Sequence, residues 1–164
     1  MKKKHISVIL ILLLILMIVI FCFSAQPGYE STITSTRVCR FLARRIFSNF
    51  ESYEKTLQNS IVSGMTHIVR KTAHFTEYAL MGFLWYLLLR KKRLNIFLSV
   101  SATAFYAASD ELHQKFVIGR SGKIADVLLD TCGGCFGILT GFVLLCILYC
   151  CTDQSVMKWG VWKK

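Results

Sequence analysis

The sequence has little charge and only one proline. Charged side chains make up 18% of its 164 residues, and hydrophobic residues make up 54%. With a mean hydropathy of +0.52, the chain is more apolar than an average soluble domain. This composition argues against an ordinary soluble domain and points to a membrane.

Three kinds of functional pattern are missing. Only 9 acidic residues stand against 20 lysines and arginines, but the excess lies in segments that flank apolar runs, and no basic groove with aromatic platforms is visible, which excludes nucleic-acid binding. The seven cysteines do not form a disulfide framework, because six of them fall in apolar runs, where cysteine behaves as a small hydrophobic residue. Neither H-E-x-x-H nor G-x-S-x-G occurs, so no familiar catalytic motif indicates a reaction.

Long apolar runs are what the sequence does have. A transmembrane helix needs about 20 mainly apolar residues to cross the hydrocarbon core, and four segments approach this description. They cover residues 6–23, 69–89, 94–116 and 124–151. A secretory signal is the alternative for the first run, but the bulky Phe23 near the candidate cleavage site favours an uncleaved span. The sequence therefore predicts an all-α membrane protein in which residues 1–164 form a single domain with four transmembrane helices.

Basic residues predict the orientation of these spans. Lysine and arginine are enriched in cytoplasmic flanks, and compact basic groups lie at the N-terminus, at residues 90–93 and at the C-terminus. With four spans, all three groups lie on the same side of the membrane. We therefore predict a multi-pass protein with both termini in the cytoplasm and with residues 24–68 as an outer loop.

The outer loop contains an amphipathic segment at residues 36–50. On a helix, one side carries Val38, Phe41, Leu42, Ile46 and Phe50, and the other side carries Arg37, Arg40 and Arg44. This pattern predicts a helix on the membrane surface, where cations meet anionic headgroups. A small solvated helix that caps the bundle is the alternative.

Ionisable residues gather on one face of each of the last three spans. At about 100° per residue, Arg70, His74 and Glu77 share a narrow strip. The predicted topology places all these faces in the outer half of the bilayer, where ionisable residues normally face the bundle interior or a wet cavity. The predicted pocket residues are Arg70, Lys71, His74, Glu77, Asp110, Glu111, His113, Gln114, Arg120, Asp126 and Asp130. A purely structural ion-pair network is the alternative.

The last span also carries a stripe of small residues. Gly133, Gly137 and Gly141 follow Asp130 at intervals of three or four residues. Such small-xxx-small patterns allow helix backbones to approach closely in lipid. We therefore predict that this stripe packs against another span.

Three blocks of the sequence resemble successive motifs of the VanZ-like family of bacterial membrane proteins. They are FSAQPG (residues 23–28), RKTAHFTEYALMG (residues 70–82) and YAASDELHQKFVIGRSGKIADVLLDTCGG (residues 106–134). Ile118 stands where the family typically has proline, while Arg120 is kept. The resemblance implies a multi-pass protein of the bacterial cytoplasmic membrane. The founding member of the family accompanies glycopeptide resistance and lowers susceptibility to teicoplanin, a lipid-tailed glycopeptide. The resemblance implies no particular reaction.

These observations support three hypotheses of function. The first is an envelope protein that binds or alters an amphiphile at the outer leaflet, with the lipid bilayer, envelope lipids, peptidoglycan precursors or the lipoglycopeptide as partners. The second is a membrane enzyme that uses the pocket for acid–base or metal-assisted chemistry on a lipid-linked or peptide-terminal substrate. Histidine and carboxylates serve both tasks, so a divalent metal is the one cofactor considered. The third, a proton-coupled transporter, is disfavoured because the cytoplasmic half of each span lacks a polar path.

Overall fold

The computed structural model describes residues 3–160, and the side chains of residues 4–151. Every regular element in this range is helical. The elements are α1 (Lys3–Ser24), α2 (Gly28–Ile46), the short 3-10 helix η1 (Phe50–Ser52), α3 (Lys55–Leu89), α4 (Asn95–Gln114) and α5 (Ile124–Gly160). The all-α prediction is therefore confirmed. Of the terminal lysines used to predict the topology, Lys2, Lys163 and Lys164 lie outside the described residues, as do the side chains of Lys3 and Lys158.

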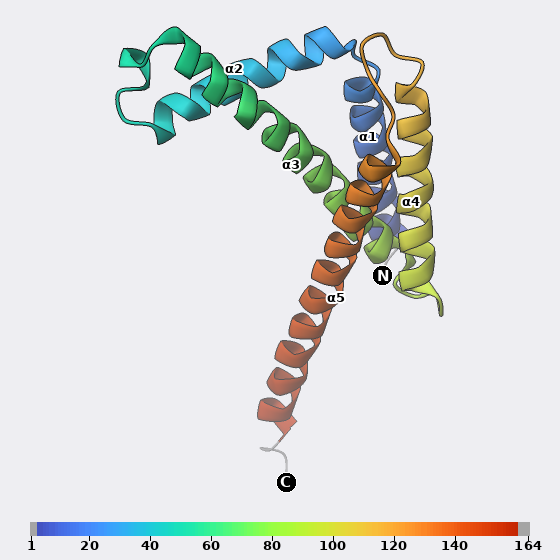
Figure 1. Cartoon of the computed structure of the whole chain (residues 1–164). Coiled ribbons are helices and arrows are strands. Elements are labelled where there is room, and N and C mark those ends of the chain that lie inside the picture. The colour runs from blue at the N-terminus through green and yellow to red at the C-terminus, as the bar shows by residue number, and fades with distance from the viewer. Residues whose placement is uncertain (1–2, 161–164) are drawn as a thin grey trace.

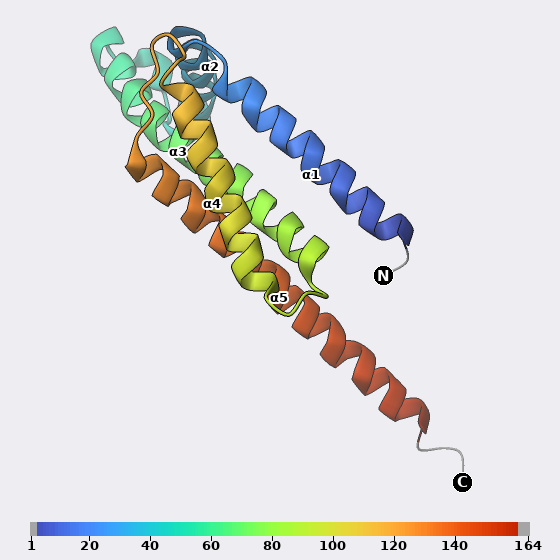
Figure 2. The same cartoon turned by 90° about the vertical axis from the view of Figure 1, so that its right-hand side faces the viewer.

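The helices form a bundle and a projecting arm (Figure 1). Four helices make the bundle, namely α1, the C-terminal part of α3, α4 and the N-terminal part of α5, and successive members run in opposite directions. The arm, which we define as residues 28–68, is the hairpin of α2 and the N-terminal part of α3. The start of α1 and the end of α5 lie at the end of the bundle away from the arm, as Figure 2 also shows.

Close backbone packing joins α3 to α5. A Cβ atom at Gly137 would lie 1.7 Å from the carbonyl oxygen of Ala79, and a Cβ atom at Gly133 would lie 2.4 Å from that of Phe75. On α3, a Cβ atom at Gly82 would lie 2.2 Å from the carbonyl oxygen of Gly134. The predicted glycine stripe therefore lies in the interface between α5 and α3, where no side chain fits.

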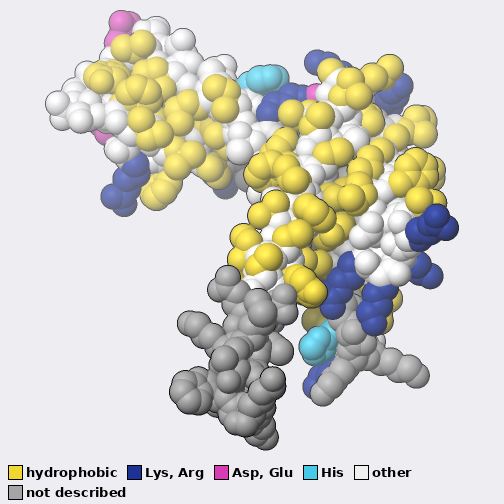
Figure 3. All heavy atoms as spheres, turned by 90° about the horizontal axis from the view of Figure 1, so that it is seen from below, with side chains coloured by type: hydrophobic (Ala, Val, Ile, Leu, Met, Phe, Trp, Pro, Cys, Tyr) yellow, Lys and Arg dark blue, Asp and Glu magenta, His cyan; other side chains and the backbone are white. Residues whose placement is uncertain are grey.

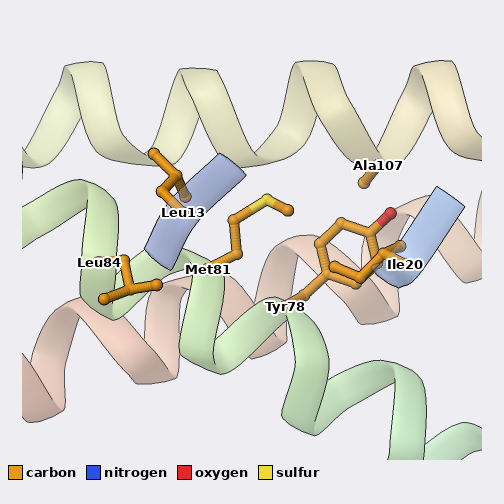
Figure 4. Close-up of a cluster of buried hydrophobic side chains, with 6 residues drawn as sticks. All are labelled: Leu13, Ile20, Tyr78, Met81, Leu84 and Ala107. Carbon is orange, nitrogen blue, oxygen red and sulfur yellow. The ribbon is translucent and has the colours of Figure 1, made fainter. Parts of the chain in front are cut away.

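The core of the bundle joins α1 to α3 and α4 (Figure 4). Its buried side chains are Leu13, Ile20, Tyr78, Met81, Leu84 and Ala107. The hydroxyl of Tyr106 donates a 2.6 Å hydrogen bond to the carbonyl oxygen of Met17. The core and this bond hold α1 against the helices that carry most of the predicted pocket residues.

The arm differs from its prediction in two respects. First, α2 ends at Ile46, and Asn49 takes a left-handed conformation with φ 59° that reverses the chain, so Phe50 belongs to η1 and is buried. Asparagine is among the residues that tolerate this conformation. Second, α3 begins at Lys55, so the span predicted at residues 69–89 is only the second part of a 35-residue helix.

The arm has a core of its own and an exposed apolar surface. Cys39 and Ala43 on α2 are buried with Phe50 and Val62. Other apolar side chains are exposed, and Figure 3 shows hydrophobic side chains spread over the arm in the view from below. The exposed ones include Tyr29, Ile33, Val38, Phe41, Ile46 and Leu57. Since burial uses a different side of α2, the face predicted to meet the membrane remains available.

Within the described residues, two helical segments are long and apolar enough to cross a membrane. They are Lys4–Ser24 and Ile124–Cys151. Helices α3 and α4 fall short of this measure because each carries several ionisable or polar side chains in its half nearer the arm. The four-span architecture therefore stays a prediction.

Candidate functional site

A cavity of about 470 Å³ lies where the arm meets the bundle. It is lined by α2, the first half of α3, the end of α4, the loop at residues 119–123 and the start of α5. Figure 3 shows histidine and basic side chains at this junction. Seven of the predicted pocket residues line the cavity, namely Arg70, Lys71, His74, Glu111, Gln114, Arg120 and Asp126.

The other four predicted residues lie elsewhere. Glu77 lines a second cavity of about 290 Å³, which adjoins the first. Asp110 and Asp130 are buried, with 4% and 1% of their surface exposed. His113 turns toward α1, where its ring lies 4.9 Å from the ring of Phe21. The structure therefore divides the predicted set into cavity-lining residues, two buried aspartates and one histidine that packs on α1.

The cavity has further lining residues that the predicted set lacks, among them Arg40, Asn59, His67, Ser121 and Lys123. Arg40 and Asn59 come from the two helices of the arm, and they are hydrogen-bonded to each other at 3.3 Å. Lys123 and Ser121 come from the loop before α5. Arg40 stood on the polar side of the predicted amphipathic helix, which was the available signal, but the arm's fold back toward the bundle was not predicted.

The acidic end of α4 is tied to the start of α5. The Gln114 side-chain amide donates to Asp110 Oδ2 at 3.0 Å and to Glu111 Oε1 at 3.2 Å. The backbone N–H of Lys123 donates to Glu111 Oε2 at 2.9 Å. A carboxylate at the N-terminus of a helix is stabilised by the unpaired N–H groups and by the helix dipole. Glu111 therefore orders the loop that forms one wall of the cavity.

The positive charges of the cavity are not all neutralised within the chain. Lys71 forms an ion pair with Asp126, which links α3 to α5. In the part of the chain that the structure describes, the Arg70 guanidinium and the Lys123 ammonium make no ion pair or hydrogen bond. These two cations are therefore available to an anion that enters the cavity.

Arg120 fastens two distant segments together. Its Nε donates to the carbonyl oxygen of Gln26 at 2.8 Å, and its Nη2 donates to that of Phe23 at 2.7 Å. Next to these bonds, the N–H of Gly28 donates to the carbonyl oxygen of Ile118 at 2.9 Å. The pKa of Arg120 is lowered mainly by burial and secondly by the nearby charge of Arg70, while Asp110 and Glu111 raise it. Since arginine stays charged in proteins, it remains a cationic clamp between the α1–α2 turn and the loop before α5.

Glycine is required where these two segments touch. A Cβ atom at Gly28 would lie 2.0 Å from the carbonyl oxygen of Gly119, and Gly119 itself has φ +74°. This left-handed conformation favours glycine. The FSAQPG block (residues 23–28) and the VIGR segment (residues 117–120) therefore meet through backbone contacts that larger side chains would prevent.

Several polar atoms are buried without a partner in the same region. Among the described residues they include both carboxylate oxygens of Asp130, Oδ1 of Asp110, Nδ1 of His74 and the Tyr78 hydroxyl. Asp130 lies within electrostatic range of Glu111, Asp110 and Lys71. Leaving a buried polar group unpaired costs about 1–3 kcal/mol. Such groups are rare in native proteins, and a cluster of them marks a candidate functional site.

The described side chains do not fit a divalent metal as they are placed. No group of three or more histidine, cysteine, aspartate or glutamate side chains in the described range is arranged to hold an ion. A catalytic metal normally takes three protein ligands. The described side chains of the site offer carboxylates, an imidazole and exposed cations.

The fold and the site define an all-helical protein with two apolar helices of membrane length and a cationic cavity. The model of the VanZ/LLP1 family matches residues 9–152, so the chain belongs to this family. The resemblance stated from the sequence motifs is therefore confirmed. No curated protein and no solved structure matches the chain.

Proposed function

We propose that this protein is a multi-pass protein of the bacterial cytoplasmic membrane that binds or alters an amphiphile of the cell envelope. The observation that supports this most is the charge of the larger cavity, which is lined by five lysines and arginines and only two acidic residues. The exposed apolar surface of the arm lies beside it. A cationic cavity next to an apolar surface suits a molecule with an anionic head and an apolar tail.

The proposal includes four transmembrane helices and an arm on the outer membrane surface. Most ionisable residues of α3 and α4 near the arm face the cavities or are buried, which is where such residues are tolerated in a membrane. The outward sides of these helices carry exposed apolar residues, among them Leu80, Phe97 and Phe105. The alternating directions of the bundle helices put the start of α1, the end of α5 and the α3–α4 turn at one end of the bundle, away from the cavity. The basic residues of these segments favour the cytoplasmic side for that end, which leaves the cavity on the outer side.

The sidedness predicts a pattern of chemical labelling. In a variant without other cysteines, Ser121→Cys in the loop before α5 should react with a membrane-impermeant thiol reagent in intact cells. Lys92→Cys, in the turn between α3 and α4, should react only after the cells are opened. Both positions are exposed, so solvent access within the protein does not distinguish them. The reverse pattern would place the cavity on the cytoplasmic side and refute the envelope proposal.

The functional consequence is tested on susceptibility to teicoplanin. Asp110→Asn keeps the shape of a buried side chain but removes the carboxylate that accepts a hydrogen bond from Gln114. We expect this variant to lose the protection conferred by the wild-type chain in a susceptible host, at equal protein level. Lys115→Gln, which changes an exposed charge one residue beyond α4, should keep it. Equal protection by both variants would show that the carboxylate of Asp110 is not needed for the function.

A membrane enzyme is the second candidate. It is favoured by the buried, unpartnered groups of His74, Asp110 and Asp130. Carboxylates and imidazole in a low-dielectric setting are the usual groups for proton transfer. On this alternative, the anionic head of the amphiphile lies near these groups and is altered rather than only bound.

A further inference from the structure

The larger cavity and the smaller one meet at the junction of the arm and the bundle. Arg70, His74 and Arg120 line both of them. The larger cavity is rich in cations and hydroxyl groups, while the smaller one combines an apolar wall with polar residues that include Glu77. The apolar wall comes from Ile20, Phe23, Val38, Val69 and Ala73. The two cavities therefore form one continuous site with a polar part and an apolar part.

The polar part offers donors from three directions. Arg70 and Lys123 are cations without a partner in the described structure, and they come from α3 and from the loop before α5. Hydroxyl groups are supplied by Thr36, Ser63 and Ser121. Arginine forms paired hydrogen bonds with phosphate, and lysine binds phosphate as a point charge. A phosphate group has enough oxygens to use donors on several sides, whereas a carboxylate presents only two.

The apolar part is open at the surface of the protein. Phe23 and Val38, on α1 and α2, are exposed by 50% and 45%. They belong to the helices that the proposal places in the membrane and on its surface. A chain lying in this part would therefore be continuous with the hydrocarbon of the bilayer.

We infer that the ligand is a lipid with a phosphate head, which Arg70 and Lys123 bind in the larger cavity while an acyl chain lies in the smaller one. The inference rests on the proposed function and adds the chemical class of the ligand. Arg70 stands at the boundary between the two parts, where it contacts the phosphate. Arg120 acts as a positioning residue there, because its Nε and Nη2 are bonded to the α1–α2 turn.

The test measures binding to the purified full-length protein in an uncharged maltoside detergent. Dioleoyl phosphatidic acid and dioleoyl phosphatidylglycerol are the phosphate lipids, inorganic phosphate is the head alone, and dioleoylglycerol and oleate are the amphiphiles without phosphate. We expect the phosphate lipids to bind most tightly and to raise the thermal unfolding temperature. A native mass spectrum reports the bound lipid independently.

Two variants examine the two parts of the site. Arg70→Gln with Lys123→Gln should weaken binding of the phosphate lipids by about tenfold or more, the equivalent of losing one charge-assisted hydrogen bond. The matched control is Lys92→Gln with Arg93→Gln, which removes two exposed cations at the α3–α4 turn and should leave binding unchanged. Lys123→Gln is measured alone as well, because Lys123 is exposed and its loss does not threaten the fold. Ala73→Phe fills the smaller cavity and should weaken binding of lipids but not of inorganic phosphate.

The possible outcomes distinguish failure of this inference from failure of the proposed function on which it rests. Equal binding of dioleoylglycerol or oleate would overturn the phosphate head while leaving an amphiphile-binding protein. Inorganic phosphate binding as tightly as the lipids, with no effect of Ala73→Phe, would overturn the acyl-chain site. If none of the amphiphiles bound, both the inference and the binding function would fall.

Discussion

Replacing Gly137 by alanine should destabilise the protein, whereas the same replacement at Gly64 should not. The new methyl group at Gly137 would lie 1.7 Å from the carbonyl oxygen of Ala79, and a backbone atom cannot rotate aside. Overpacking a close interface costs about 1–3 kcal/mol. At Gly64 nothing lies within 4 Å of the new atom, and alanine in a helix is better than glycine by about 0.5–1 kcal/mol.

Thermal unfolding of both variants in the same detergent measures this difference. We expect the unfolding temperature to fall for Gly137→Ala and to stay equal or rise for Gly64→Ala. Similar unfolding temperatures would show that α3 and α5 are not in direct backbone contact. Because the two changes are chemically identical, general effects of adding a methyl group to a helix cancel in the comparison.

Substitution of the two aspartates at the start of α5 should change stability in opposite directions. Asp130→Asn removes a carboxylate that is 1% exposed and lies near the carboxylates of Glu111 and Asp110, so the free energy of unfolding should rise by about 1 kcal/mol. Asp126→Asn breaks the ion pair with Lys71, whose side chain is one-third exposed, so stability should fall by at most about 1 kcal/mol.

The same Asp130→Asn protein tests whether the buried carboxylate serves a function. Proteins often keep a destabilising group at a site that needs it. We expect the more stable variant to have lost protection against teicoplanin. Mass spectra of extracted lipids distinguish the two candidate functions. If the protein is an enzyme, cells with the wild-type chain contain an altered lipid, and cells with the Asp130→Asn variant or without the protein lack it. Increased stability with full protection would mark Asp130 as dispensable, and decreased stability would mark it as a structural group.

The sequence predicted the bundle better than the arm. Apolar runs located α1 and α5, and helical periodicity identified the faces that carry Arg70, Asp126 and the glycines. The structure shows that Arg70 and Asp126 line one cavity and that the glycines contact α3. Both signals are local, since they depend only on residues a few positions apart. The first part of α3 has no apolar run, so its helix and its return toward the bundle had no comparable signal.

Two features of the site depend on contacts between distant parts of the chain. Arg120 bonds to residues 94 and 97 positions earlier, and nothing in its surroundings in the sequence identifies those carbonyl groups. His113 shares a helical face with Asp110, yet it packs on Phe21 of α1. A helical wheel gives the side of a helix but not the neighbour that occupies it. The sequence therefore indicated which residues are candidates, and the packing decided which of them line the cavity.

The length of α3 connects the arm mechanically to the inside of the bundle. This helix has 35 residues without proline, which corresponds to about 50 Å of unbroken rod. Its first part lies in the arm, and its later part carries His74 and Glu77 and is held against α5 by glycine contacts. A tilt of the arm, imposed by lipid packing or bilayer thickness, would turn this rod about those contacts. With the arm on the membrane surface, as proposed, α3 would act as a lever through which the physical state of the bilayer reaches the buried carboxylates.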